Sequence, residues 1–330
     1  MTWRRALLSV VTILLTLFPG TAGAQTSPNQ GQPRFRSAVD VVSVTAVVRD
    51  RKGRFVRDLL PKDFVVAEAG EPKRILDFRS EADGPVRLAL LFDVSGSMRV
   101  GRKAVDAREA ARQLFGAMRP MDQAAVFMFD TRLQRVQDFT SDVGALAASL
   151  DHMDPPYGQT SIYDAIDETA RAVPVADGRG TPLPQRAAVV VLTDGIDTRS
   201  RLRPEQVTAV ASGIDVPVYV VAVMSSIDDP RESAEAADGG PASALANLAQ
   251  WTGGTLFTAT SPAHASVAAR QIVDELRHQY VLAFEASGQP GWRPLEVRAR
   301  DRGLIVRARA GYTAGGPTGS SSDDARREER

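Results

Sequence analysis

The chain has 330 residues, about twice the roughly 150 residues of a typical single domain, and its 43% of hydrophobic residues can bury a sizeable core. Its 40 basic and 40 acidic residues balance, which excludes the net positive charge of a general nucleic-acid-binding protein. The absence of cysteine and the presence of only three histidines exclude disulfide scaffolds, thiolate zinc sites and cysteine nucleophiles.

The N-terminus has the pattern of a secretory signal peptide. Arg4 and Arg5 precede an apolar run over residues 6–18, and an Ala-Gly-Ala sequence at 22–24 provides an A-x-A cleavage site. A run of about 13 residues is too short to cross a bilayer, which needs about 20. We therefore predict a signal peptide at 1–24, no stable membrane span after its removal, and a secreted or periplasmic protein of the cell envelope.

After the predicted signal peptide, the composition changes from that of a linker to that of β-strands. Residues 25–36 are polar and rich in turn-forming residues, which indicates a linker. An N-terminal β segment is predicted over 37–84, because residues 41–48 are rich in β-branched side chains. Within it we expect a hairpin that pairs residues 64–68 with 74–78.

A central region over residues 85–280 alternates short apolar runs with amphipathic helical patterns. The apolar runs are residues 88–92, 125–129, 187–192, 216–223 and 255–257. The helical patterns are residues 104–118, 143–150, 162–173, 204–211, 242–251 and 265–276. Strands that are apolar on both faces and alternate with helices predict an α/β domain with a doubly wound, mainly parallel sheet.

The C-terminal part again has the sequence pattern of β-strands. Residues 281–313 largely alternate apolar with polar side chains, which predicts a C-terminal β segment in an antiparallel sheet. Residues 314–330 have the composition of a disordered tail. Because predicted β segments stand on both sides of the central region, we expect these two segments to assemble a small β-sandwich-like accessory domain.

Three predicted loops carry most of the polar chemistry of the central region. Residues 93–97 follow the first apolar strand, and residues 158–161 open a helix. Residues 193–195 follow a third apolar strand. Because loops at the carboxyl ends of parallel strands share one edge of the sheet, we expect these loops to meet there.

The three loops supply five hard oxygen donors. Three are hydroxyls and two are carboxylates: Ser95, Ser97, Thr160, Asp93 and Asp194. This set suits Mg²⁺, with Mn²⁺ or Ca²⁺ as alternative ions. Neutral hydroxyl ligands leave a divalent cation poorly neutralised, so we expect an Asp or Glu carboxylate of a partner protein to complete its coordination.

Structural roles explain some of these residues when they are considered singly. Asp93 or Ser95 alone has the chemistry of a helix N-cap, and only the combination of three loops favours a metal site. Ser161 and Asp164 have the spacing of a capping box with Asp in place of Glu. Asp197 is interpreted as a turn or cap residue.

Catalytic motifs are incomplete. Residues 96–103 have the glycine spacing of a P-loop, but Arg102 replaces its lysine and Lys103 its Ser or Thr. The loop at Asp93 lacks the first glycine of a G-x-S-x-G elbow, and no histidine is placed to make a triad obvious. We therefore predict that the protein is not an enzyme and has no catalytic residues.

The combination Asp93-x-Ser95-x-Ser97, Gly158-Gln159-Thr160 and Thr193-Asp194-Gly195 resembles the metal-ion-dependent adhesion site of von Willebrand factor A (VWFA) domains. The flanks resemble the exported bacterial VWFA-related proteins first catalogued in Acidobacteria. That second resemblance is carried by Val44–Asp50 with Gly53, Leu59–Phe64 with Glu68 and Gly70, Gln279–Leu282, and Ala310–Tyr312.

The resemblance implies a Rossmann-like VWFA domain at 85–280 and a role in protein binding. Ser95, Ser97 and Thr160 would coordinate the ion, and Asp93 and Asp194 would contribute directly or through water. The function expected is an exported, divalent-cation-dependent, adhesion-type module that captures an acidic residue of a partner. The alternative is a structural envelope scaffold whose metal site only stabilises the fold, and the oligomeric state is left open.

Overall fold

A computed structural model describes residues 41–80, 84–153, 157–173, 186–213, 215–224 and 241–314. The predicted signal peptide and linker lie outside the described residues, as does the predicted tail beyond residue 314. Within the described ranges, no helix combines the length and the apolar character that a membrane crossing requires.

The central sheet has six strands. Their order is β10 (Leu256–Ala259), β9 (Val218–Val223), β8 (Arg186–Thr193), β5 (Val86–Asp93), β6 (Gln123–Phe129) and β7 (Leu133–Thr140). Neighbours from β10 to β6 are parallel, and β7 joins antiparallel at the edge. The side chains of β5 alternate between two separate cores, with Leu90 in one and Leu91 in the other. A strand buried on both faces explains the uninterrupted apolar run.

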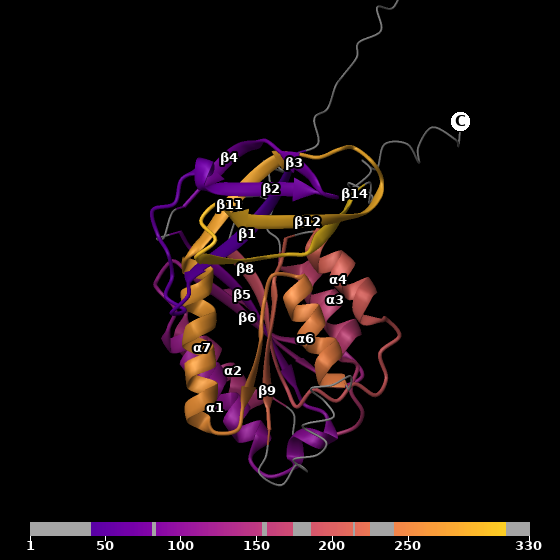
Figure 1. The fold of residues 1–330 in the computed structure, drawn as a ribbon. Helices are drawn as coiled ribbons and strands as arrows, with labels where there is room; N and C mark the ends of the chain where they lie inside the picture. Colours follow the sequence, from indigo (N-terminus) through magenta and orange to yellow (C-terminus); the bar gives the residue numbers. More distant parts are fainter. Residues whose placement is uncertain are drawn as a thin grey trace, which may run out of the picture. The chain divides into compact units, whose positions relative to one another are not determined.

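Helices cover both faces of this sheet (Figure 1). One face packs against α1 (Lys103–Gly116), α2 (Val143–Ser149) and α7 (Pro262–Arg277). The other face packs against α3 (Ile162–Ala172), α4 (Pro204–Gly213) and α6 (Pro241–Trp251). The doubly wound α/β fold predicted from the sequence is thereby confirmed.

Two smaller sheets are built jointly from the N- and C-terminal flanks. The first contains β13 (Leu304–Ala308), β1 (Val41–Asp50), β11 (Gln279–Glu285) and β4 (Ile75–Arg79) in that order. The second contains β14 (Gly311–Ala314), β12 (Gly291–Ala299), β2 (Phe64–Glu68) and β3 (Glu71–Lys73). Both contribute to one apolar core that includes Val44, Phe64 and Phe284. The accessory domain of sandwich type, assembled from both flanks, is confirmed.

The expected hairpin in the N-terminal flank is wrong in its second strand. A two-residue turn at Ala69 and Gly70, both with positive φ, pairs Glu68 with Glu71, so β2 pairs with β3. β4 leaves this sheet and pairs with β11 in the other one. The edge strand β7 was also missed, because its side chains are at most partly buried and it has little of the continuous apolar pattern of the buried strands.

The sandwich contacts the edge of the central sheet where its parallel strands begin. Arg307 of β13 donates a hydrogen bond to the carbonyl of Gly253, shortly before β10, and the Ala310 N–H donates to the carbonyl of Trp251 (2.9 Å). Arg49 of β1 contacts Glu275 at the end of α7 (2.8 Å). These contacts lie at the opposite edge from the loops that follow β5 and β8.

Candidate metal centre

Asp93 is held by groups from two neighbouring strands. Parallel pairing of Phe92 with Leu192 places Asp93 beside Thr193, whose hydroxyl donates to Asp93 Oδ2 (2.5 Å). The Ser95 N–H donates to Asp93 Oδ1 (2.8 Å). The same Thr193 oxygen accepts the Gly195 N–H (3.0 Å), which also fixes the start of the third loop. Both carboxylate oxygens are therefore oriented by the ends of β5 and β8.

The first loop brings two hydroxyls together. A 3₁₀ helix over Gly96–Arg99, labelled η2, begins directly after Ser95. The Ser95 and Ser97 hydroxyl oxygens lie 3.1 Å apart. Ser95 is buried and Ser97 is partly exposed, so the pair extends from the interior of the site toward its surface.

Thr160 lies on a loop that is bound to the other two loops. The Gly96 N–H donates to the carbonyl of Gly158 (3.0 Å), and a Cβ at Gly96 would lie only 3.1 Å from that oxygen. The Thr160 N–H donates to the Thr198 hydroxyl (2.9 Å), and the Thr198 N–H donates back to the Thr160 carbonyl (3.0 Å). The structure thus places Thr160, itself buried, between the first loop and the segment that follows the third loop.

Asp194 is paired with Lys103, which stands in the sequence where a P-loop would have Ser or Thr. Lys103 Nζ, at the first residue of α1, lies 3.2 Å from Asp194 Oδ2. Both side chains are buried. The two residues are 91 positions apart in the chain, which explains why no local pattern indicated this pair.

Burial dominates the electrostatics of Asp93. Removal from water is the largest effect on the pKa of Asp93 and raises it. Hydrogen bonds from Ser95 and Thr193 lower this pKa, the nearby charge of Asp194 raises it, and the net result is a pKa of about 6. A carboxylate in this environment is poorly compensated by the protein. Together with the neutral hydroxyls, it fits a small, hard divalent cation.

Few carboxylates take part in the predicted donor set. Among the residues that the structure describes, no three His, Cys, Asp or Glu side chains form a group suited to hold a metal ion. The predicted donor set contains only two side chains of these types, so its ligand capacity rests mainly on the three hydroxyls.

The capping box predicted at α3 is wrong. Ser161 makes no side-chain capping bond, and Asp164 instead accepts from the backbone N–H groups of Arg201 and Leu202. Asp197 accepts the Ile162 N–H (2.8 Å), which confirms its interpretation as a turn or cap residue. The first turn of α3 is therefore capped by the segment that follows the third loop, a tertiary contact that the local pattern could not reveal.

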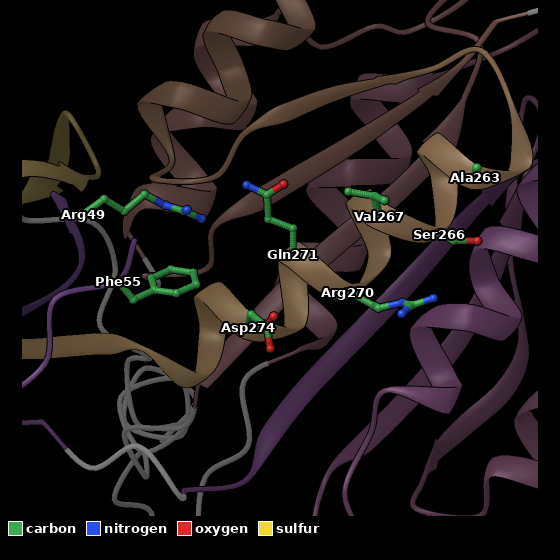
Figure 2. Close-up of a pocket in the computed structure, with 8 residues that line it drawn as sticks. All are labelled: Arg49, Phe55, Ala263, Ser266, Val267, Arg270, Gln271 and Asp274. Carbon is green, nitrogen blue, oxygen red and sulfur yellow. The ribbon is translucent and has the colours of Figure 1, made fainter. Parts of the chain in front are cut away.

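Two hollows are lined by residues other than the predicted donors. One of about 190 Å³ adjoins the first and second loops and is lined by Val94, Tyr157 and residues of β6, β7 and their connection. The other, of about 530 Å³, lies along α7. Figure 2 shows Arg49 and Phe55 facing Gln271 and Asp274 across this second hollow.

The family comparison identifies the class of the central domain. Residues 88–196 match the model of the von Willebrand factor type A domain, and this range includes all five predicted donors. The chain therefore contains a von Willebrand factor type A domain. No curated protein matches the chain.

Several solved structures are similar to parts of the chain. A von Willebrand factor type A protein from Catenulispora acidiphila is 12% identical over 84% of this chain and 76% of its own, with a TM-score of 0.48. The conserved hypothetical protein BatB from Bacteroides thetaiotaomicron is 17% identical over 58% of this chain and 98% of its own, with a TM-score of 0.45. Proximal thread matrix protein 1 from the mussel byssus, with a zinc-occupied MIDAS motif, is 19% identical over 64% of this chain and 50% of its own, with a TM-score of 0.47.

Proposed function

We propose that the von Willebrand factor type A domain binds a divalent cation, with Mg²⁺ as the expected ion, and uses it to capture an Asp or Glu of a partner protein. The observation that carries this proposal is the meeting of three loops at one edge of the sheet around the buried Asp93. The accessory sandwich contacts the opposite edge, so it does not cover the loops.

The residues of the site have distinct tasks in this proposal. Ser95, Ser97 and Thr160 would hold the cation through neutral oxygens, and Asp93 and Asp194 would supply the negative charge. Thr193 orients Asp93 through its short hydrogen bond. When bound, the cation supplies a Lewis-acidic position that accepts a carboxylate oxygen from outside the chain.

Export to the periplasm or the cell exterior is part of the proposal and rests on the signal-like N-terminus. The role proposed is binding and not catalysis, because the loop at Asp93 lacks the first glycine of a G-x-S-x-G elbow and no histidine is placed to make a triad obvious. The further resemblance to exported VWFA-related proteins catalogued in Acidobacteria remains a prediction. The alternative of a scaffold whose metal only stabilises the fold is distinguished by the experiment below.

The test compares the mature chain with Ser95→Ala and, as a control, Ser141→Ala, which changes an exposed serine outside the three loops. Mg²⁺ is titrated while the melting temperature is followed. We expect Mg²⁺ to raise the melting temperature of the unchanged chain and the control, and to have little effect on Ser95→Ala.

Partner binding is then measured by capture from a cell-envelope extract in Mg²⁺ and in EDTA. We expect capture that requires Mg²⁺, is absent with Ser95→Ala, and is competed by a short peptide containing Asp but not by the same peptide with Asn. Stabilisation by Mg²⁺ without metal-dependent capture would support the scaffold instead.

A further inference from the structure

Three large apolar side chains are exposed on or beside the loops of the candidate metal centre. Val100 is 41% exposed, Tyr157 is 76% exposed and Ile196 is 45% exposed. Single exposed apolar side chains are ordinary on a protein surface. The placement of these three is what distinguishes them, because each lies within three residues of a predicted metal donor.

Backbone contacts hold two of these residues beside the donors. The Val100 N–H donates to the carbonyl of Ser97 (3.2 Å), and the Ile196 N–H approaches Asp194 Oδ1 (3.5 Å). Both side chains therefore start from backbone that is fixed to the candidate site. A large part of each nevertheless remains in contact with solvent.

Tyr157 is attached to the first loop and lines the smaller hollow. Its N–H donates to the carbonyl of Val94 in that loop (2.7 Å). Tyr157 and Val94 line the hollow of about 190 Å³ together with Met128 and Phe129. Val94, Met128 and Phe129 are buried, so the hollow beside the candidate site has an apolar lining on part of its surface.

The charged residues that line this hollow balance. Arg132 and Asp130 contribute one charge of each sign, and Asp130 Oδ1 accepts the Arg132 N–H (2.8 Å). The other polar lining residues, Gln134 and Tyr157, are neutral. The described lining therefore does not favour a charged occupant, and an apolar side chain would gain by leaving water there.

We propose that Val100, Tyr157, Ile196 and the smaller hollow form a docking surface around the cation for a partner segment in which apolar residues accompany the captured Asp or Glu. This inference rests on the proposed function, because binding of the partner's carboxylate to the cation is what brings neighbouring side chains over the three loops. In an extended segment, side chains two positions apart share one face and lie about 6.6 Å apart. Apolar residues two positions from the captured carboxylate therefore face the same loops as the carboxylate.

The apolar surface would supply the selectivity that a cation alone lacks. A metal ion accepts the carboxylate of any accessible Asp or Glu, and most protein surfaces carry many of them. Burial of apolar side chains against Tyr157 and its neighbours favours the segments that carry both features. Tyrosine is among the residues that contribute most to binding when they are buried at the centre of an interface.

The experiment measures the binding of two fluorescently labelled peptides of equal charge by anisotropy, in Mg²⁺ and in EDTA. One is Leu-Ser-Asp-Ser-Leu and the other is Ser-Ser-Asp-Ser-Ser, both with blocked ends. Tyr157→Ala removes the most exposed of the three side chains, and Tyr157→Phe keeps its ring. Met121→Ala is the matched control, because Met121 is 75% exposed but precedes β6 at the opposite edge of the sheet.

In Mg²⁺ we expect the unchanged chain to bind the leucine peptide about tenfold more tightly than the serine peptide, equivalent to about 1.4 kcal/mol. Tyr157→Ala should lose most of this preference and bind the serine peptide as the unchanged chain does. Tyr157→Phe and Met121→Ala should keep the preference. EDTA should weaken the binding of both peptides.

Equal affinity for the two peptides, or binding of neither, would overturn the docking surface, and so would a preference that persists in EDTA. Equal weakening of both peptides by Tyr157→Ala would also overturn it, because the side chain would then act on the metal site itself. Self-association of the chain that Tyr157→Ala abolishes, seen in sedimentation, would assign the surface to a second copy instead.

Urea unfolding shows which variants are folded, and Ile196→Ala replaces Tyr157→Ala should the latter not fold. The outcomes that overturn the docking surface leave the proposed function standing, provided that capture from the envelope extract still requires Mg²⁺. Absence of any effect of Mg²⁺ on the unchanged chain, in melting temperature and in peptide binding alike, would overturn both.

Discussion

Two buried carboxylate centres of this chain differ sharply in how the protein compensates their charge. Glu68 in the sandwich is 1% exposed and receives an ion pair from Lys73 (2.8 Å) and another from Arg293 (3.2 Å). The Tyr312 hydroxyl (2.7 Å) and both the hydroxyl and the N–H of Ser287 also donate to it. Although burial raises its pKa, these donors outweigh burial and lower the pKa of Glu68 to about 2.

Asp93 in the central domain is buried to a similar degree but has only hydroxyl and backbone donors. Burial therefore dominates, and its pKa is raised to about 6. Burial alone therefore does not define the role of a carboxylate. Glu68 is paired with two cations and accepts hydrogen bonds from two neutral residues, which indicates a structural role, whereas the described contacts of Asp93 include no cation.

The largest expected effect comes from removal of the structural carboxylate. Glu68→Ala leaves Lys73 and Arg293 partly buried without their anion, and loss of one partner of a buried ion pair costs about 3 kcal/mol of unfolding free energy. Urea unfolding measures this loss, and Mg²⁺ affinity should stay unchanged. Glu296→Ala, at an exposed position of β12, is the matched control.

A loss below about 1 kcal/mol in Glu68→Ala would contradict a structural role for this centre. A simultaneous loss of Mg²⁺ binding in a folded Glu68→Ala protein would show that the two centres are not independent.

The second prediction concerns the carboxylate that lacks a cation. Asp93→Asn removes a poorly compensated buried charge but keeps an oxygen that can accept the Ser95 N–H. We expect Mg²⁺ affinity to fall roughly 100-fold, about 2.7 kcal/mol, while the unfolding free energy in EDTA stays within about 0.5 kcal/mol or rises. Calorimetry and urea unfolding measure the two quantities, and a large loss of stability in EDTA would make Asp93 a structural carboxylate like Glu68.

The sequence pattern predicted the fold best for strands whose side chains are buried on both faces. Runs such as residues 88–92 and 187–192 are apolar on both faces because both faces of the central sheet are covered by helices, so the parallel core was predictable. The donors at positions 93, 95 and 97 were predictable as a group because they follow one such run directly. Their role as metal ligands remains a prediction that the experiments above test.

Contacts between distant segments were not predictable from local patterns. Lys103 meets Asp194 only because α1 and the loop after β8 come together in the folded chain, and Asp197 caps α3 from another loop. The partner of β2 was misjudged because the tight turn at Ala69 makes β3 the strand that pairs with it. The next strand, β4, pairs with β11 in the other sheet. Each of these features depends on tertiary structure and leaves no periodic signal.

The last prediction uses acid to test the compensation of Glu68. Because the folded protein lowers the pKa of Glu68 from its ordinary 4.5 to about 2, this group contributes stability that is fully present above about pH 5 and is lost as the pH falls toward 2. In Glu68→Gln that contribution is absent at every pH. The difference in unfolding free energy between the unchanged chain and Glu68→Gln should therefore shrink by on the order of 2 kcal/mol between about pH 5 and pH 2.

Urea unfolding of both proteins in EDTA across this range measures the difference, and use of the difference cancels the titration of the carboxylates that the two proteins share. A difference that stays constant with pH would mean that Glu68 has an ordinary pKa in the folded protein, and the contrast with Asp93 would then lose its electrostatic basis. A difference that shrinks as expected assigns the acid sensitivity of the sandwich to its internal ion pairs. Glu68 then needs no metal ion for its stabilising role, because Lys73 and Arg293 supply its positive charge. In its described contacts, Asp93 has no such pair of cations.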